Sequence, residues 1–197
     1  MPNLQQMFNW AVNWCNRSNV GYDQSYRNMQ VRPSDQVTCF DCSSFTFFAM
    51  WQGGGFDIPS LGFPSDLSGY TQVPHLPNHN AWDVPMMESF LPALGWTSYP
   101  VGTIQPQAGD ICVITNQHCE IMYEGAQYIM MGARNPGLPL VDQVSIHTVG
   151  QIYFDANFNT IWRYGTGPTP PTPGFPIPIW LLKAAKERST YGNPGFL

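Results

Sequence analysis

The spacing of apolar residues predicts two helices in the first third of the chain. From Asn3 to Cys15 apolar side chains recur every three or four residues, which is typical of an amphipathic helix with one face on the core. The polar segment from Gly21 to Gln36, which contains a proline, predicts a loop. The chain then runs from Asp41 into an apolar block that ends at glycines 53–55, and this predicts a buried helix with Asp41 near its N-cap. Cys42 would lie in the first turn of that helix.

The pattern changes from helical to strand-like along the next hundred residues. The segment from Phe56 to Asn80 is rich in proline, glycine and serine, and predicts a long loop that is functional or wraps the surface. Helical spacing returns from Trp82 to Leu94 and stops at Gly95. Short apolar or alternating runs then predict antiparallel strands at Ile111–Thr115, His118–Glu124, Gln127–Ala133, Gln143–Val149 and Thr160–Tyr164. Helices followed by a sheet of this kind indicate an α+β domain.

The composition changes again after Gly165. Proline at high density over 166–179 predicts an extended linker, and Trp180–Arg188 predicts an amphipathic helix too short to be stable alone. A chain of 197 residues accommodates one domain with an appendage. The expected division is therefore a folded domain over 1–165, a proline-rich linker over 166–179 and a helical tail over 180–197.

Charge and hydropathy exclude several classes of partner. The formal net charge is −5, and the only lysines are Lys183 and Lys186, so no basic stripe is available to bind nucleic acid. The N-terminal residues lack the positive segment and apolar run of a secretory signal peptide, and no stretch approaches the ~20 apolar residues of a membrane span. We expect a protein made in a cytoplasm whose export, if any, depends on another factor.

The 5 cysteines have an odd count and irregular spacing, which favours free thiols over a disulfide framework. Cys39 and Cys42 form a C-x-x-C pair, but no second ligand pair has matching spacing. His118 and Cys119 would point to opposite faces of a strand. We therefore expect neither a metal site nor a cofactor.

Two residues have the surroundings of a nucleophile and its base. A cysteine at a helix N-terminus has a lowered pKa because unpaired N–H groups and the helix dipole favour its thiolate, and Cys42 has that placement. His118 begins a strand, which is a rigid position from which an imidazole can face a helix end. Taken singly, each residue is better explained as part of the structure: a cysteine before an aromatic helix is usually a small core residue, and a lone histidine in a strand is more often structural. The sequences around them favour the catalytic interpretation.

Two separated segments resemble the NlpC/P60 peptidoglycan hydrolases. The first reads GYDQSYR and later DCSSFTFF, like that family's tyrosine, polar loop, Asp-Cys-Ser-Gly/Ser and hydrophobic helix. The second reads QAGDICV and then QHCEIMYEG, like the family's Pro-Gly-Asp strand and its strand of the form H-x-G-I-Y-x-G. The resemblance covers about Gly21 to Tyr164, and Asp-Cys-Ser-Ser is common in phage-encoded members. It implies a papain-like fold with N-terminal helices packed on an antiparallel sheet.

The resemblance implies roles for individual residues. Cys42 matches the nucleophile and His118 the general base, and the family places a third polar residue on the next strand to orient the imidazole. That strand here reads QYIMMGARNP and has no histidine. Asn135 is the candidate, because the guanidinium of Arg134 has no acceptor for an imidazole N–H. Asn135 fits a turn before Pro136 equally well.

Further positions match residues that contact the substrate in the family. Tyr22 matches the tyrosine whose hydroxyl helps to bind the oxyanion, although packing on the core explains it equally well. Asp41 and Ser43 match positions that contact the stem peptide, and capping alone would also explain Asp41. Glu120 replaces a glycine two residues after His118, and we leave three roles open for it: holding the imidazole, binding a substrate amino group, or lying in solvent. No motif surrounds the remaining histidines, His75, His79 and His147.

The function implied by the resemblance is hydrolysis of an amide bond in peptidoglycan, within the stem peptide or between muramic acid and L-Ala. The setting would be phage: a virion-tail enzyme, joined to other tail proteins by its C-terminal tail, or an endolysin held in the host cytoplasm before release to the wall. Two alternatives are an inactive structural tail protein that keeps the fold and a CHAP-type N-acetylmuramoyl-L-alanine amidase.

Overall fold

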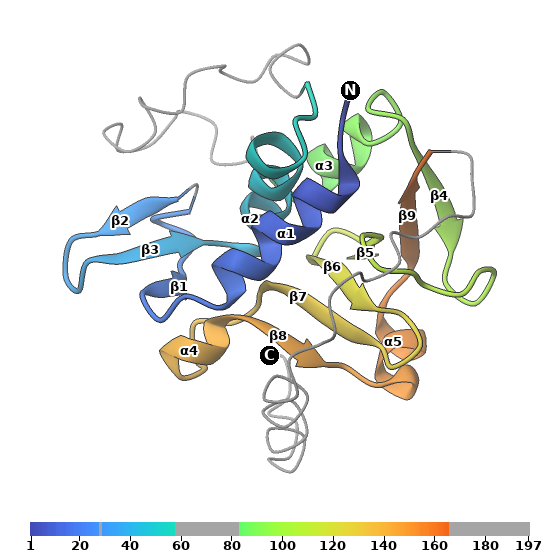
Figure 1. Cartoon of the computed structure of the whole chain (residues 1–197). Helices are drawn as coiled ribbons and strands as arrows, with labels where there is room; N and C mark the ends of the chain where they lie inside the picture. Colours follow the sequence, from blue (N-terminus) through green and yellow to red (C-terminus); the bar gives the residue numbers. More distant parts are fainter. Residues whose placement is uncertain (28, 58–82, 166–197) are drawn as a thin grey trace.

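The structure of the protein is a computed structural model, which describes residues 1–27, 29–57 and 83–165 (Figure 1). The predicted linker 166–179 and tail 180–197 lie outside the described residues. The same is true of most of the predicted loop, including His75 and His79, and of Trp82 at the start of the third predicted helix.

The described residues form an α+β chain. Its helices are α1 (Leu4–Cys15), α2 (Cys42–Phe48), the π-helix η1 (Ala49–Gly53), α3 (Val84–Phe90), α4 (Leu140–Gln143) and α5 (Gln151–Asn157). Its strands are β1 (Val20–Tyr22), β2 (Gln30–Arg32), β3 (Val37–Phe40), β4 (Trp96–Pro100), β5 (Ile111–Ile114), β6 (His118–Glu124), β7 (Ile129–Ala133), β8 (Val144–Thr148) and β9 (Thr160–Tyr164). The prediction of helices followed by an antiparallel sheet is confirmed.

A 6-stranded sheet in the order β4-β9-β5-β6-β7-β8 organises the molecule, and all its neighbouring strands are antiparallel. An ion pair fixes the start of β5 to β9: the Arg163 guanidinium donates to both carboxylate oxygens of Asp110 at 2.9 and 2.6 Å. This end of β5 lies beside the middle of the central strand β6, where Ile111 pairs with Ile121.

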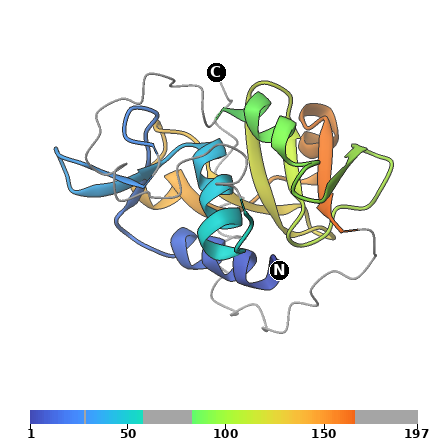
Figure 2. The same ribbon diagram turned by 90° about the horizontal axis from the view of Figure 1, so that it is seen from above.

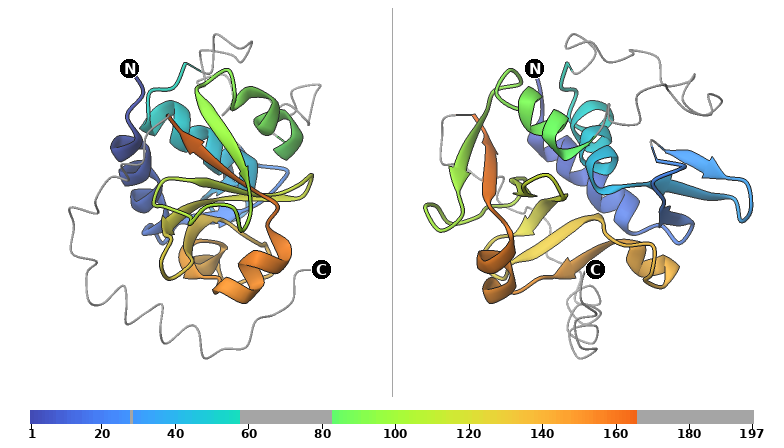
Figure 3. Two further views of the ribbon diagram at one scale, coloured as in Figure 1. Left: turned by 90° about the vertical axis from the view of Figure 1, so that its right-hand side faces the viewer. Right: turned by 180° about the vertical axis from the view of Figure 1, so that it is seen from behind.

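The two faces of this sheet carry separate cores. Helices α1 and α2 pack on the face to which Cys119, Ile121 and Met131 belong. Helix α5 covers the other face, where Phe154 packs with Met122. Figure 3 shows the sheet between these helices in its left panel. Because side chains alternate along a strand, Glu120 lies on the same face as Met122, away from α2.

The first two helices begin where the sequence predicts. The side chain of Asn3 caps α1 by accepting from the N–H of Gln6 at 3.0 Å. Asp41 caps α2 by accepting from the N–H of Ser44 at 2.9 Å, and the Ser44 hydroxyl accepts from the Asp41 N–H at 3.0 Å. Every residue of α2 is buried, and the helix continues as the π-helix η1 instead of as an α-helix. In Figure 2, α1 lies beside the helical segment formed by α2 and η1, and it contacts η1.

The prediction of a loop from Gly21 to Gln36 is wrong in part. The segment contributes strands β1 and β2 to a 3-stranded sheet in the order β1-β3-β2, with β1 parallel to β3. These strands are three residues long, too short for their alternation to be recognised in the sequence.

Strand β4 and helix α5 are also absent from the predicted elements. Strand β4 pairs only with β9 and is largely exposed, so its sequence lacks a strong apolar pattern.

Candidate active site

Cys42 occupies the first position of α2. The capping box of Asp41 and Ser44 fixes the backbone immediately around it, and Thr46 donates to its carbonyl at 3.1 Å. The Cys42 side chain is nearly buried, with 7% of its surface exposed. The residue is therefore held rigidly at a helix N-terminus, where backbone N–H groups favour a negative charge.

The start of β6 packs against this end of α2 and places two side chains on the sulfur. A hydrogen bond with Cys119 lowers the pKa of Cys42 most, burial opposes this, and a hydrogen bond with His118 and its positive charge lower the pKa further. The net result is a thiol pKa well below its ordinary value. His118 and Cys119 thus both reach Cys42, although their adjacency in a strand predicts opposite faces. Cys42 lies at the end of the strand, where both side chains are accessible to it.

Glu120 holds the imidazole of His118. The Nε2 atom of His118 lies 2.7 Å from Oε1 of Glu120, and the same imidazole makes a hydrogen bond with Cys42. Burial alone would lower the pKa of His118, but the hydrogen bonds with Cys42 and Glu120 raise it to about 10. A raised histidine pKa and a lowered cysteine pKa together describe a thiolate–imidazolium pair at neutral pH.

Glu120 cannot contact a substrate, because only 1% of it is exposed. Of the three roles left open by the sequence, the structure gives it the role of holding the imidazole, and its assignment to substrate binding is corrected. Burial favours the neutral form of this carboxyl, but the charge of His147 and hydrogen bonds with His118 and His147 hold its pKa far below the ordinary range. His147 extends from β8, with Nε2 3.1 Å from Oε2 of Glu120.

A glycine on the intervening strand makes room for this carboxylate. Gly132 of β7 lies between Glu120 and Ser145 in the strand register. A Cβ at Gly132 would lie 3.0 Å from Cγ and 3.4 Å from Cβ of Glu120. The first distance is tighter than most Cβ contacts, so a larger residue at this position would require the Glu120 side chain to shift by a few tenths of an ångström.

Asn135 has the alternative role that the sequence allowed. Its side-chain oxygen accepts from the backbone N–H of Gly137 at 2.7 Å, which is the geometry of a turn. The position beside His118 belongs to Glu120 instead, so the assignment of Asn135 as the third catalytic residue is corrected. The family resemblance predicts such a residue on the next strand, whereas Glu120 lies on the same strand as the histidine.

An arginine pairs with the residues that flank Cys42. The Nε atom of Arg27 lies 3.0 Å from Oδ2 of Asp41, and an Nη atom donates to the hydroxyl of Ser43 at 2.9 Å. Burial raises the pKa of Asp41 to about 6, although the Arg27 charge opposes this. Asp41 and Ser43 are thus engaged within the protein. The sequence analysis did not assign a role to Arg27.

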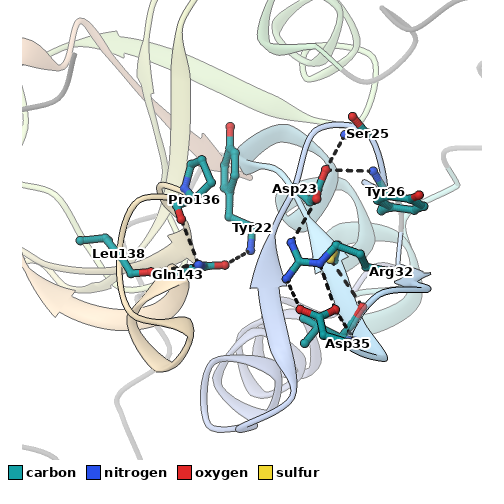
Figure 4. A network of polar contacts seen from close by, with 11 residues as sticks. Tyr22, Asp23, Ser25, Tyr26, Arg32, Asp35, Pro136, Leu138 and Gln143 are labelled. Carbon is teal, nitrogen blue, oxygen red and sulfur yellow. Dashed lines mark hydrogen bonds and ion pairs between the residues drawn. The ribbon is translucent and has the colours of Figure 1, made fainter.

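Tyr22 reaches the same region from β1. Its backbone N–H donates to Oε1 of Gln143 at 2.9 Å, and the Gln143 amide donates to the carbonyls of Pro136 and Leu138 at 3.1 and 2.9 Å (Figure 4). The phenol ring extends away from Gln143 in this view. Burial, followed by the negative charges of Cys42 and Asp41, raises the pKa of Tyr22, so the hydroxyl remains protonated near the sulfur.

A second network in Figure 4 fixes the turn that follows Tyr22. The Asp23 carboxylate accepts from the backbone N–H groups of Ser25 and Tyr26 and pairs with Arg32 at 3.1 Å. The turn leads directly to Arg27. Gln143 and Asp23 therefore position the two side chains, Tyr22 and Arg27, that approach Cys42 from outside α2.

All 5 cysteines are free and buried, as their count and spacing predict. Burial raises the pKa of Cys15, Cys39, Cys112 and Cys119. Cys42 is thus the thiol in the chain whose pKa is lowered. Among the described residues, no group of three or more histidine, cysteine, aspartate or glutamate side chains is arranged to hold a metal ion.

Within residues 1–27, 29–57 and 83–165, no helix is long and apolar enough to cross a membrane. Comparison with known proteins finds no matching family model and no matching curated sequence. The class of site is therefore defined by its chemistry: a thiol at a helix N-terminus, an imidazole beside it and a buried carboxylate behind the imidazole.

Proposed function

We propose that this chain is a thiol hydrolase that cleaves an amide bond in bacterial peptidoglycan, with Cys42 as nucleophile and His118 as general acid and base. Its fold would be the papain-like fold of the NlpC/P60 enzymes. The arrangement of Cys42, His118 and Glu120 is the observation that carries the proposal. A nucleophile, a base within reach and a group that orients the base are the parts that acyl transfer requires.

The reaction follows from these positions. The Cys42 thiolate attacks the amide carbon, and the oxyanion that forms would accept hydrogen bonds from the Tyr22 hydroxyl and a backbone N–H beside Cys42. Imidazolium His118 gives its proton to the departing amine, and the C–N bond breaks to leave a thioester. His118 then takes a proton from water, which attacks the thioester and regenerates the thiolate.

The choice of peptidoglycan rests on the two sequence segments that resemble NlpC/P60 enzymes, GYDQSYR with DCSS and QAGDICV with QHCEIMYEG. The Asp-Cys-Ser-Ser form favours a phage enzyme, either a component of the virion tail or an endolysin. An inactive tail protein was the alternative suggested by the missing third histidine. Glu120 now fills that third position, which favours an active enzyme.

A zymogram on purified bacterial cell walls tests the proposal. The wild-type chain should clear the wall and Cys42→Ala should not. Cys39→Ser is the matched control, because it changes a buried cysteine three positions away and should leave clearing intact. Equal clearing by wild type and Cys42→Ala, or clearing by neither, contradicts the thiol hydrolase. Mass spectrometry of the released muropeptides then distinguishes an endopeptidase from a CHAP-type amidase.

A further inference from the structure

We propose that His147 is a positioning residue of this site: it holds Glu120 charged and in place behind His118, and so keeps Cys42 reactive. The inference rests on the proposed function, since it concerns the efficiency of the same thiol. The sequence assigned no role to His147, and the family resemblance supplies none.

The geometry gives each oxygen of the Glu120 carboxylate its own imidazole. Oε1 lies 2.7 Å from Nε2 of His118, and Oε2 lies 3.1 Å from Nε2 of His147. The second distance is longer than the first, and together the two contacts place an imidazole beside each carboxylate oxygen. A carboxylate only accepts, and therefore Nε2 of His147 carries a hydrogen. Its Nδ1 lies 3.5 Å from the Ser145 carbonyl, which helps to fix the ring.

Burial makes this second imidazole necessary. Glu120 is almost fully buried, and an unpaired carboxylate there would be costly enough to take up a proton or turn away. Solvent has little access to this contact while His147 is present, because the side chains of His147 and Glu120 are only 9% and 2% exposed. Gly132 leaves the space in which the carboxylate reaches both rings.

The effect reaches Cys42 through charge. If His147 is removed, Glu120 loses support for its negative charge and stabilises imidazolium His118 less. When the imidazolium form of His118 is less stable, the pKa of His118 falls. The Cys42 thiolate then has less positive charge beside it, so the pKa of the thiol rises. The range of pH over which thiolate and imidazolium coexist therefore narrows from both sides.

The other groups that face Glu120 do not replace His147. Cys15 of α1, Cys112 of β5 and Tyr153 of α5 are near enough to feel its charge, and each has a raised pKa for which burial is the largest cause. All three remain neutral near pH 7. Around Cys42 the charged neighbours are Asp41 and Arg27, which already pair with one another.

The test measures the rate of Cys42 alkylation by iodoacetamide from pH 4 to pH 10 in the intact chain. His147→Ala should move the midpoint of this curve upward by about one pH unit and slow alkylation about tenfold on its acidic side. His147→Gln, whose amide can still donate to Oε2, should restore most of the rate. Ser145→Ala is the matched control on the same strand and face, and should leave the midpoint unchanged.

The outcomes separate a positioning role from a structural one. A His147→Ala chain that is folded by circular dichroism but keeps the wild-type midpoint would overturn the inference, as would an equal shift in the alanine and glutamine variants. If His147→Ala does not fold, His147→Gln is compared with His147→Asn, whose shorter amide should give the higher midpoint. The midpoint is measured without cell walls. A shifted midpoint in a chain that clears no wall therefore contradicts the proposed hydrolase and supports the role of His147.

Discussion

The guanidinium of Arg27 lies 3.0 Å from the carboxylate of Asp41, directly beside the candidate nucleophile. Both side chains are largely buried, at 14% and 6% exposure. A buried pair of this kind contributes little when intact but is costly to break, because the remaining charge loses its partner. The pair therefore matters both for the stability of the chain and for the charge near Cys42.

Arg27→Ala should destabilise the fold in a pH-dependent way. The pKa of Asp41 is raised to about 6, so the carboxyl is neutral at pH 4 and charged at pH 8. Because the pKa of Asp41 is higher in the folded state than in the unfolded state, this group contributes most to the free energy of unfolding when both states are protonated, at low pH. That contribution is lost as the pH rises through about 6. Removing Arg27 raises the pKa further, so the loss should be small at pH 4 and about 3 kcal/mol at pH 8.

Urea unfolding at the two pH values measures this difference. Arg32→Ala serves as the control, because Arg32 pairs with Asp23 and Asp35, which are both more exposed than Asp41, and its loss should destabilise the fold much less than the loss of Arg27. A loss for Arg27→Ala that is the same at pH 4 and pH 8 would contradict the assigned pairing.

Iodoacetamide at pH 7 should modify Cys42 ahead of the other four cysteines. The Cys42 thiol has a lowered pKa, whereas burial raises the pKa of the others, including that of Cys39 to about 11. Peptide mapping by mass spectrometry after brief labelling checks the order. Uniform labelling, or faster labelling of Cys39 than of Cys42, would show that the thiolate is not stabilised.

Glu120→Gln should lower the rate of wall hydrolysis between roughly 10-fold and 1000-fold while retaining the shape of the side chain. The amide cannot stabilise imidazolium His118 as the carboxylate does. The pKa of about 10 for His118 predicts that activity persists to about that pH in the wild type, and the basic limit should move downward in the variant. A turbidity assay on cell walls between pH 5 and pH 11 measures both effects, and an unchanged basic limit would exclude the contact.

Gly132→Ala should impair the site more than the fold. The new Cβ would approach Cγ of Glu120 to 3.0 Å and push the carboxylate away from His118. Gly132 does not have a positive φ, and alanine suits a strand better than glycine, so the melting temperature should change little. The combination to look for is near-normal thermal unfolding with slower Cys42 alkylation. Normal alkylation in this variant would mean that the carboxylate position is unimportant.

The parts of the fold with strong local signals could be predicted from the sequence. The α1 cap at Asn3, the α2 cap at Asp41 and the ends of β6 and β9 all lie where the apolar pattern changes. Strands β1 and β2 could not be found in this way, because they are stabilised by pairing with β3. Tertiary contacts, which a short polar sequence does not display, determine such elements.

The candidate site was predictable to a similar extent. Cys42 and His118 stand next to recognisable sequences, whereas His147 lies two strands away from Glu120 and has no motif. The sequence left three roles open for Glu120, because the alternation of side chains along a strand shows which face of the sheet a residue lies on but not whether that residue is buried. One available signal was Gly132, since a glycine inside a strand often marks the close approach of another group.

The location of Glu120 and His147 on the α5 side of the sheet has a consequence for how such a protein can change over time. Both side chains are buried, so a ligand at Cys42 does not touch the two groups that support His118 from behind. The surface around Cys42 can therefore change with the ligand, while the buried support for the thiolate stays the same. Selectivity and reactivity would then be inherited as separate traits of one small domain.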